Sequence, residues 1–327
     1  MSLPTFKLLR PRTLEEAVQF LARHGGNIQV LAGGTDLLPS MKQKLFTPAY
    51  IMDIRGIEEL RGIHVVPGAG AEIGALTSLS TIEDSEFMRR NYRVLYEAAI
   101  TVASPILRNM GTLGGNICLD TRCVWYNQSL QWRKSCGFCI KKDGDLCHVA
   151  PGGTLCWAAF SGDTPPALLC LNTELEIIGP KGVRRVPLAQ FYTNLGDAHL
   201  KLDPNEMLTR IFLPESSAGW KGSYQKLRIR GSIDYPLAGV AVAFKKNGGP
   251  VEAARVAITA VNPSPMLVPG AEHALVGKQP DEHVAAVVGE LAAKTAKPLT
   301  TSGLTPEYRR EMIKVFAKRA VLAAAKT

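Results

Sequence analysis

"VLAGGTDLL" spans Val30 to Leu38 and carries a short apolar strand, predicted over residues 28–31, into a turn built on two adjacent glycines. The segment before it, Thr13 to Gly26, predicts a helix, because Thr13 can cap it and Glu16 follows three residues later. A helix that leads into a strand and then into a glycine turn is typical of a small α/β unit. The chain therefore begins with a mixed α/β fold.

A second glycine stretch, "GTLGGNI" (Gly111–Ile117), has the same character. Adjacent glycines let backbone N–H groups converge and let the chain approach a ligand closely, and nearby Thr, Asp and Asn side chains add hydrogen bonds. Such turns suit a pyrophosphate, although a Gly-Gly pair taken alone is more often an ordinary tight turn. "GxGxxG" after a first strand is absent, so NAD binding by a Rossmann unit is not expected.

The bulk composition limits the classes of protein. The chain has 327 residues, 46% hydrophobic and 20% charged, and a mean hydropathy near zero, so two or three globular domains are expected. The net charge is +9, but the basic residues are scattered and no nucleic-acid motif accompanies them, so we expect no nucleic-acid binding. No apolar run is long enough to span a membrane and no signal-peptide pattern opens the chain, so we expect a cytoplasmic protein.

Five of the seven cysteines lie between residues 121 and 157, in a segment rich in glycine and lysine. A long segment without apolar periodicity inside a compact domain usually means a functional insertion. Cytoplasmic cysteines are expected to be thiols or metal ligands rather than disulfides. Four thiolates suit a [4Fe–4S] cluster, one per iron, but a four-cysteine zinc site or free thiols also fit the residues alone. Cys170, in an apolar run, is expected to be a buried core thiol.

Four motifs in order carry a family resemblance: "VLAGGTDLL", "IGALTSLSTIE", "VASPILRNMGTLGGNI" and "SGDTPPALL". With them the chain resembles the FAD-binding (medium) subunits of the molybdenum hydroxylases, the group of carbon monoxide and xanthine dehydrogenases. The resemblance implies a two-part FAD domain of the vanillyl-alcohol-oxidase-like type followed by a C-terminal α+β domain. The predicted divisions are residues 1–60, 61–180 with the insertion at 119–161, and 181–327.

The resemblance also assigns roles to individual residues. The FAD pyrophosphate would be lined by Ala32, Gly33, Gly34, Thr35 and Asp36. The second phosphate and the ribityl chain would meet Thr112, Gly115 and Asn116, with Val102 and Ala103 nearby. Asp163 would lie near the sugar-phosphate or adenosine side, unless it only caps a helix. Lys226 would lie near the isoalloxazine, unless it is a solvated strand residue.

The insertion resembles one member type in particular, the β subunit of 4-hydroxybenzoyl-CoA reductase, whose FAD domain carries an extra loop with a [4Fe–4S] cluster. The resemblance favours Cys123, Cys139, Cys147 and Cys156 as ligands and leaves Cys136 as a bystander. His148, beside Cys147, is expected to be solvated or hydrogen-bonded rather than a ligand.

The implied function is an electron-transfer subunit without a catalytic residue of its own. Electrons from reduced ferredoxin would pass through the [4Fe–4S] cluster and FAD to a small [2Fe–2S] subunit and a large molybdenum-cofactor subunit, which would convert 4-hydroxybenzoyl-CoA to benzoyl-CoA. The family suggests a dimer of heterotrimers. The alternatives are the FAD subunit of an ordinary molybdenum hydroxylase with a structural zinc loop, and a non-catalytic binding module.

Overall fold

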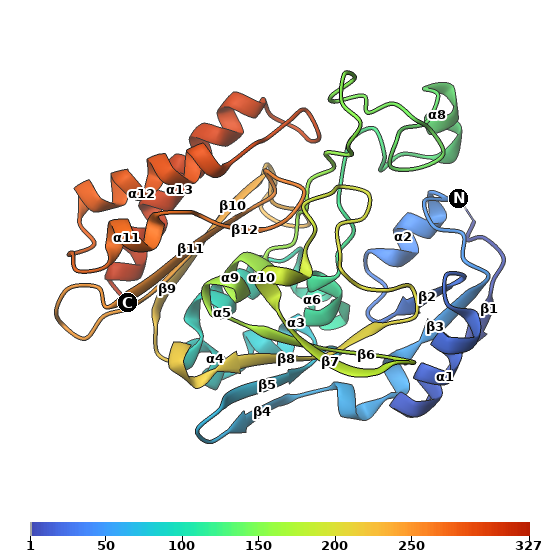
Figure 1. Cartoon of the computed structure of the whole chain (residues 1–327), viewed down its shortest axis with the longest axis horizontal. Helices are drawn as coiled ribbons and strands as arrows, with labels where there is room; N and C mark the ends of the chain where they lie inside the picture. Colours follow the sequence, from blue (N-terminus) through green and yellow to red (C-terminus); the bar gives the residue numbers. More distant parts are fainter. Residues whose placement is uncertain (1) are drawn as a thin grey trace.

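The computed structural model describes residues 2–327 and contains three β-sheets with helices between and outside them (Figure 1). The first sheet is three-stranded and parallel, in the order β1 (Lys7–Leu9), β3 (Tyr50–Asp53), β2 (Ile28–Leu31). Two helices accompany it, α1 (Leu14–His24) and α2 (Leu37–Lys42). Thr13 caps α1 by accepting a hydrogen bond from the Glu16 N–H, as the sequence predicts.

The second sheet is five-stranded and antiparallel. Its order is β4 (Ile63–Val66), β5 (Gly70–Gly74), β8 (Met207–Pro214), β6 (Glu174–Gly179), β7 (Gly182–Pro187). Strands β7 and β8 follow residue 180, where the sequence prediction ended this unit, yet both pair with β6. Strand β7 forms a hairpin with β6, whereas β8 returns to the centre of the sheet through a long connection that leaves no local signal in the sequence.

The third sheet is antiparallel, in the order β12 (Met266–Leu267), β11 (Ala253–Thr259), β10 (Ala238–Lys245), β9 (Lys221–Leu227). Its two faces follow the alternation of side chains along β10. Val240, Val242 and Phe244 pack in one apolar cluster with the C-terminal helices, whereas Ala241 and Ala243 pack in the cluster of the second sheet. The C-terminal helices are α11 (Ala271–Leu275), α12 (Glu282–Thr295) and α13 (Pro306–Ala325). The last two confirm the two closing helices that the sequence predicts at roughly residues 281–297 and 305–325.

A layer of short helices lies between the second and third sheets (Figure 1). Its members are α3 (Leu79–Glu83), α4 (Glu86–Asn91), α5 (Arg93–Ile100), α6 (Pro105–Met110), α7 (Leu113–Ile117), α9 (Thr164–Cys170) and α10 (Leu188–Phe191). The apolar run "PALLC" (Pro166–Cys170) is predicted from the sequence to be strand-like, but it forms α9, with Pro165 and Pro166 in the first turn. All residues of α9 are buried, so no periodicity distinguishes a helix from a strand there. Cys170 is fully buried, as expected.

The insertion extends away from this layer, beside α2 and near the C-terminal helices (Figure 1). It holds one helix, α8 (Leu130–Ser135), among turns. Its two ends are joined by a bridge in which Arg122 and Ala159 exchange backbone hydrogen bonds of 2.8 Å. Mixed α/β architecture with a two-part first domain and a C-terminal domain is the predicted fold class. Among residues 2–327, none of the helices combines the length and apolar character needed to cross a membrane.

Candidate flavin and thiol site

The first glycine loop, residues 32–36, joins β2 to the start of α2. Gly34 has a positive φ of 76°, which reverses the chain tightly. Among the hydrogen bonds within residues 2–327, none uses the backbone N–H of Gly33, Gly34, Thr35 or Asp36 as donor. A run of unpaired N–H groups at the start of a helix is an arrangement that accepts an anionic ligand.

The second glycine stretch lies directly against the first. A Cβ atom at Gly33 would come within 1.8 Å of the Met110 carbonyl oxygen, so only glycine allows this approach of the two backbones. A Cβ at Gly111 would lie 3.7 Å from the Thr35 hydroxyl. The fold thus brings together two motifs that the sequence separates by about 75 residues, which the sequence alone could not show.

The polar groups of the second stretch are engaged within the protein. Thr112 caps α7 by accepting a hydrogen bond of 3.0 Å from the Gly115 N–H. Asn116 Oδ1 accepts from the N–H and the hydroxyl of Thr164, at 3.0 and 2.7 Å. The contacts of Thr112, Gly115 and Asn116 with FAD stay a prediction. In the structure, Thr112 stabilises the start of α7, and Asn116 joins α7 to α9.

The turn after α5 contains Val102 and Ala103 and meets the segment after β9. Ala103 has a φ of 45°, and its carbonyl oxygen accepts a hydrogen bond of 2.8 Å from the Ile233 N–H. Lys226 Nζ donates to the carbonyl of Thr101, at 2.9 Å. The predicted residues of this turn are therefore close to the predicted Lys226.

Asp163 and Lys226 form a buried ion pair with an Oδ2–Nζ distance of 2.9 Å. Tyr224 adds a hydrogen bond of 2.8 Å from its hydroxyl to Asp163 Oδ1. Burial raises the pKa of the Asp163 carboxyl, and the Lys226 ammonium acts in the opposite direction. Lys226 is thus not a solvated strand residue, and Asp163 stands at the N-cap of α9 without a capping hydrogen bond. The two residues, assigned to different parts of the flavin, contact each other.

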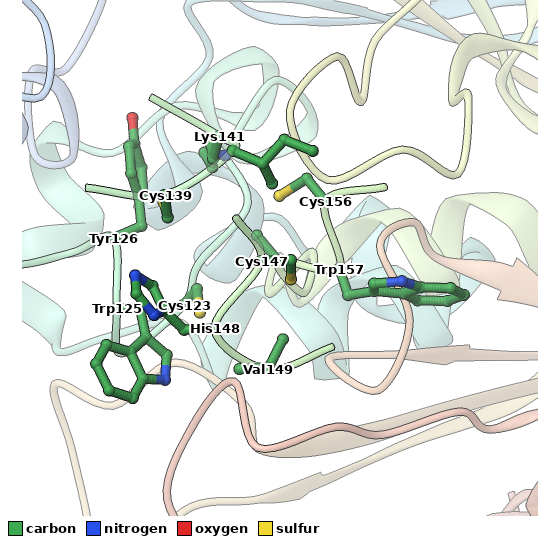
Figure 2. A pocket seen from close by; sticks show the side chains of 12 residues that line it. Cys123, Trp125, Tyr126, Cys139, Lys141, Cys147, His148, Val149, Cys156 and Trp157 are labelled. Atoms are coloured by element: carbon green, nitrogen blue, oxygen red, sulfur yellow. The ribbon is translucent and has the colours of Figure 1, made fainter. Parts of the chain in front are cut away.

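Four of the five clustered cysteines line one cavity, which we call the cysteine chamber (Figure 2). Its cysteines are Cys123, Cys139, Cys147 and Cys156, the four that the resemblance favours, and all four are buried. Cys136 ends α8 and does not line the chamber. The remaining lining residues are Trp125, Tyr126, Ile140, Lys141, His148, Val149, Trp157 and Ala158.

The thiols border a space rather than meet at one point. Among the described residues, no three His, Cys, Asp or Glu side chains are grouped so that they could hold a metal ion. The chamber encloses about 20 Å³, somewhat more than one water molecule requires. Burial raises the pKa of Cys123 and of Cys156 to about 11, so both are protonated thiols at neutral pH in this state.

One cation and one aromatic stack support the chamber. Lys141 is buried and donates to Asp120 Oδ1 at 2.7 Å, to the Thr121 hydroxyl, and to the Gly196 carbonyl at 2.9 Å. The ring of His148 stacks on Trp125 with centroids 4.5 Å apart, and its Nε2 is hydrogen-bonded to the Phe138 carbonyl. His148 is therefore hydrogen-bonded, as expected.

Arg122 and Tyr235 complete the loop of residues 32–36 and were not among the predicted site residues. Both reach Asp36 Oδ1, with Arg122 Nη1 at 3.1 Å and the Tyr235 hydroxyl at 2.8 Å. Burial raises the pKa of Asp36, and Arg122 lowers it. The position of Arg122 directly before Cys123 was the one available signal in the sequence. Tyr235 had none, since it lies almost 200 residues away in the chain, in the connection between β9 and β10.

Comparison with known proteins agrees with this geometry. Residues 4–216 match a family described as "FAD binding domain in molybdopterin dehydrogenase", and residues 222–324 match "CO dehydrogenase flavoprotein C-terminal domain". The carbon monoxide dehydrogenase medium chain of Afipia carboxidovorans is 30% identical over 97% of this chain and 96% of its own. The aldehyde oxidoreductase FAD-binding subunit of Escherichia coli is 33% identical over 82% of this chain and 85% of its own.

A solved structure of Cu,Mo-carbon monoxide dehydrogenase, in its cyanide-inactivated form, gives a TM-score of 0.83 at 28% identity and covers 100% of this chain and 99% of that one. These relatives support the FAD-subunit part of the prediction. They favour the ordinary molybdenum hydroxylase over the 4-hydroxybenzoyl-CoA reductase, which was the leading expectation from the sequence.

Proposed function

The chain belongs to the FAD-binding subunits of the molybdopterin dehydrogenases, and we propose that it is the electron-transfer subunit of such an enzyme. The unpaired N–H groups of residues 33–36, set against the second glycine stretch, carry this proposal. They would hold the FAD pyrophosphate, while the Asp163–Lys226 pair would place a fixed charge distribution beside the binding region. When bound, FAD supplies transfer of one or two electrons at a time.

The partners follow from the relatives, which are named medium chains and FAD-binding subunits. We propose a large molybdenum-cofactor subunit and a small [2Fe–2S] subunit as partners, in a dimer of heterotrimers located in the cytoplasm. The molybdenum chemistry would take place on the large subunit.

We further propose that the cysteine chamber holds a [4Fe–4S] cluster, which supplies one-electron transfer when bound. Four thiols face the chamber and the fifth does not, which matches one thiolate per iron. A structural zinc site usually has two close cysteine pairs, and the insertion has only one, Cys136 and Cys139.

The chamber also supports a more specific function, that of the electron-transfer subunit of a 4-hydroxybenzoyl-CoA reductase. In it, reduced ferredoxin donates electrons, and 4-hydroxybenzoyl-CoA takes up two electrons and two protons on the large subunit to give benzoyl-CoA and water. In an ordinary molybdenum hydroxylase, electrons would flow in the opposite direction, from the molybdenum subunit to FAD. Such an enzyme needs no cluster in this chain. The four facing thiols favour the reductase, whereas the named relatives favour the hydroxylase.

Anaerobic quantitation of iron, acid-labile sulfide, zinc and flavin tests the cofactor proposal on the full chain. We expect about four irons, four sulfides and one FAD per chain. Cys123→Ser should lose the iron, and Cys136→Ser, the matched control outside the chamber, should keep it. Zinc in place of iron, or retention of iron by both variants, would reject the cluster in the chamber.

The assembled enzyme separates the two directions of electron flow. Formation of benzoyl-CoA from 4-hydroxybenzoyl-CoA with reduced ferredoxin would support the reductase. Oxidation of carbon monoxide, an aldehyde or a purine with an artificial acceptor, and no reduction of the thioester, would support the hydroxylase.

A further inference from the structure

Helix α2 is held at both ends by arginines of the insertion. At its N-terminal end, Arg122 Nη1 lies 3.1 Å from Oδ1 of the N-cap residue Asp36. At its C-terminal end, Arg133 Nη2 donates to the Lys44 carbonyl at 3.0 Å and to the Gln43 carbonyl at 3.4 Å. The helix that begins at the flavin loop is therefore clamped by the segment that carries the thiols.

Arg122 has little freedom to move independently of the chamber. Its backbone is paired with Ala159, and it directly precedes Cys123. Its guanidinium lies over the ring of Tyr235, 4.1 Å from the centroid, and Tyr235 in turn bonds to Asp36. A displacement of Cys123 is thus passed to Asp36 through one side chain.

Arg133 connects the other side of the chamber. It is fully buried, and its Nε and Nη1 atoms have no hydrogen-bond partner among the described residues. The nearest carboxylate is that of Asp143, with Nη1 3.7 Å from Oδ2, on the turn between Cys139 and Cys147. A buried guanidinium with so few partners is held by its surroundings, so its two bonds to α2 depend on how that turn is packed.

Apolar packing also joins the insertion to the segment that follows α2, in addition to the bonds of the two arginines. Leu45 and Phe46, which follow α2, pack in one cluster with Cys123, Cys139 and Cys156. Three chamber cysteines therefore share an apolar cluster with the segment that follows α2, the helix whose N-terminal loop presents the unpaired N–H groups.

We propose that Arg122 and Arg133 are positioning residues that couple occupancy of the cysteine chamber to FAD binding. The inference rests on the proposed function. A centre ligated by the four thiolates would order the turns that carry both arginines, and the arginines in turn fix α2 and the loop at its start. Coupling between two sites is reciprocal, so FAD must favour retention of the metal centre by the same factor.

The test compares the FAD dissociation constant of the full chain in two states, by flavin fluorescence under anaerobic conditions. In one state the chamber is loaded with iron and sulfide, and in the other it is emptied by a chelator. We expect FAD to bind about tenfold more tightly to the loaded chain, within the usual range of coupling between sites. The ratio of the FAD dissociation constant of the emptied chain to that of the loaded chain should fall to about one in Arg122→Gln. Arg122→Lys should keep part of the tenfold difference.

Two further variants control the experiment. Lys134→Gln changes an exposed cation of α8 next to Arg133 and should keep the full ratio. Tyr235→Phe removes only the hydroxyl bond to Asp36 and leaves the ring beneath Arg122, so it should fold normally and give an intermediate ratio.

The outcomes separate this inference from the proposed function. Equal FAD affinity in the loaded and emptied wild-type chain would overturn the coupling, while a normal iron content would leave the cluster proposal intact. Zinc in place of iron would reject the cluster. The FAD dissociation constants of the zinc-loaded and the emptied chain would then be compared, and equal values would overturn the coupling. If Arg122→Gln weakened FAD binding equally in the loaded and the emptied chain, Arg122 would only support the flavin loop and would not couple the two sites. A chamber that binds no metal would overturn both proposals.

Discussion

Lys226 Nζ lies 2.9 Å from Asp163 Oδ2, and both side chains are less than 5% exposed. One residue comes from a strand of the third sheet and the other from the start of α9, so the pair joins the FAD-binding part of the chain to the C-terminal domain. Each charge compensates the burial of the other, and neither has a second charged partner at hydrogen-bond distance among the described residues.

Asp163→Asn should lower the free energy of unfolding by about 3–5 kcal/mol, because it leaves the Lys226 ammonium buried without a counter-charge. Urea unfolding checks this. Asp203→Asn is the matched control, since Asp203 pairs with Lys181 at the surface and should contribute less than about 1 kcal/mol. Similar losses in the two variants would show that the buried pair has no special weight.

Gly33→Ala should abolish stable FAD binding, because the added Cβ would lie 1.8 Å from the Met110 carbonyl oxygen and force the two glycine stretches apart. The steric conflict should also lower the free energy of unfolding by about 1–3 kcal/mol. Flavin content after gel filtration and urea unfolding are the measurements. Gly152→Ala, where a Cβ meets nothing within 4 Å, should behave as wild type. Full flavin content in Gly33→Ala would contradict the close approach.

His199 should make the protein less stable in acid. Burial lowers its pKa from 6.5 to about 4, and the neutral ring is hydrogen-bonded through Nε2 to the Leu119 carbonyl at 2.9 Å. The unfolded chain binds a proton at pH values where the folded chain does not, so this stability is present above pH 6.5 and is lost as the pH falls towards 4. The loss should approach about 3 kcal/mol.

The measurement is the free energy of unfolding from pH 7 to pH 4, for wild type and His199→Gln. The variant should show a smaller decline over this range, because its side chain does not titrate. Parallel curves would assign the acid sensitivity to other groups.

Lys141→Met should destabilise the insertion, because it removes the buried cation that holds Asp120 and the Gly196 carbonyl together. Removing the ammonium leaves the Asp120 carboxylate with only the His199 ring as a basic neighbour among the described residues, at 4.0 Å, and should cost about 3 kcal/mol. Trp125 and Trp157 line the chamber, so tryptophan emission during urea unfolding reports the change locally. Lys142→Met, at the neighbouring and more exposed cation, should change little, and an equal loss there would refute the role of Lys141.

Local patterns predicted much of the fold. The cap at Thr13, the strand before Gly33 and the two C-terminal helices were predicted from the sequence because each depends on neighbours within a few residues. The error at α9 has the same origin: a segment buried on all sides offers no alternation or helical period to read. The place of β8 in the middle of the second sheet also had no local signal.

For the site, the sequence by itself determined which groups are available: glycines that permit close backbone approach, a carboxylate, a lysine, and five thiols in one insertion. Tertiary structure alone decided which of them meet. It placed four thiols around one chamber and left Cys136 outside, joined Asp163 to Lys226, and set Arg122 between Cys123 and Asp36. The physical reason is that residue type and short-range spacing fix the chemistry and the local backbone. Ion pairs and cavities, in contrast, form between segments whose approach is set by the packing of the whole chain.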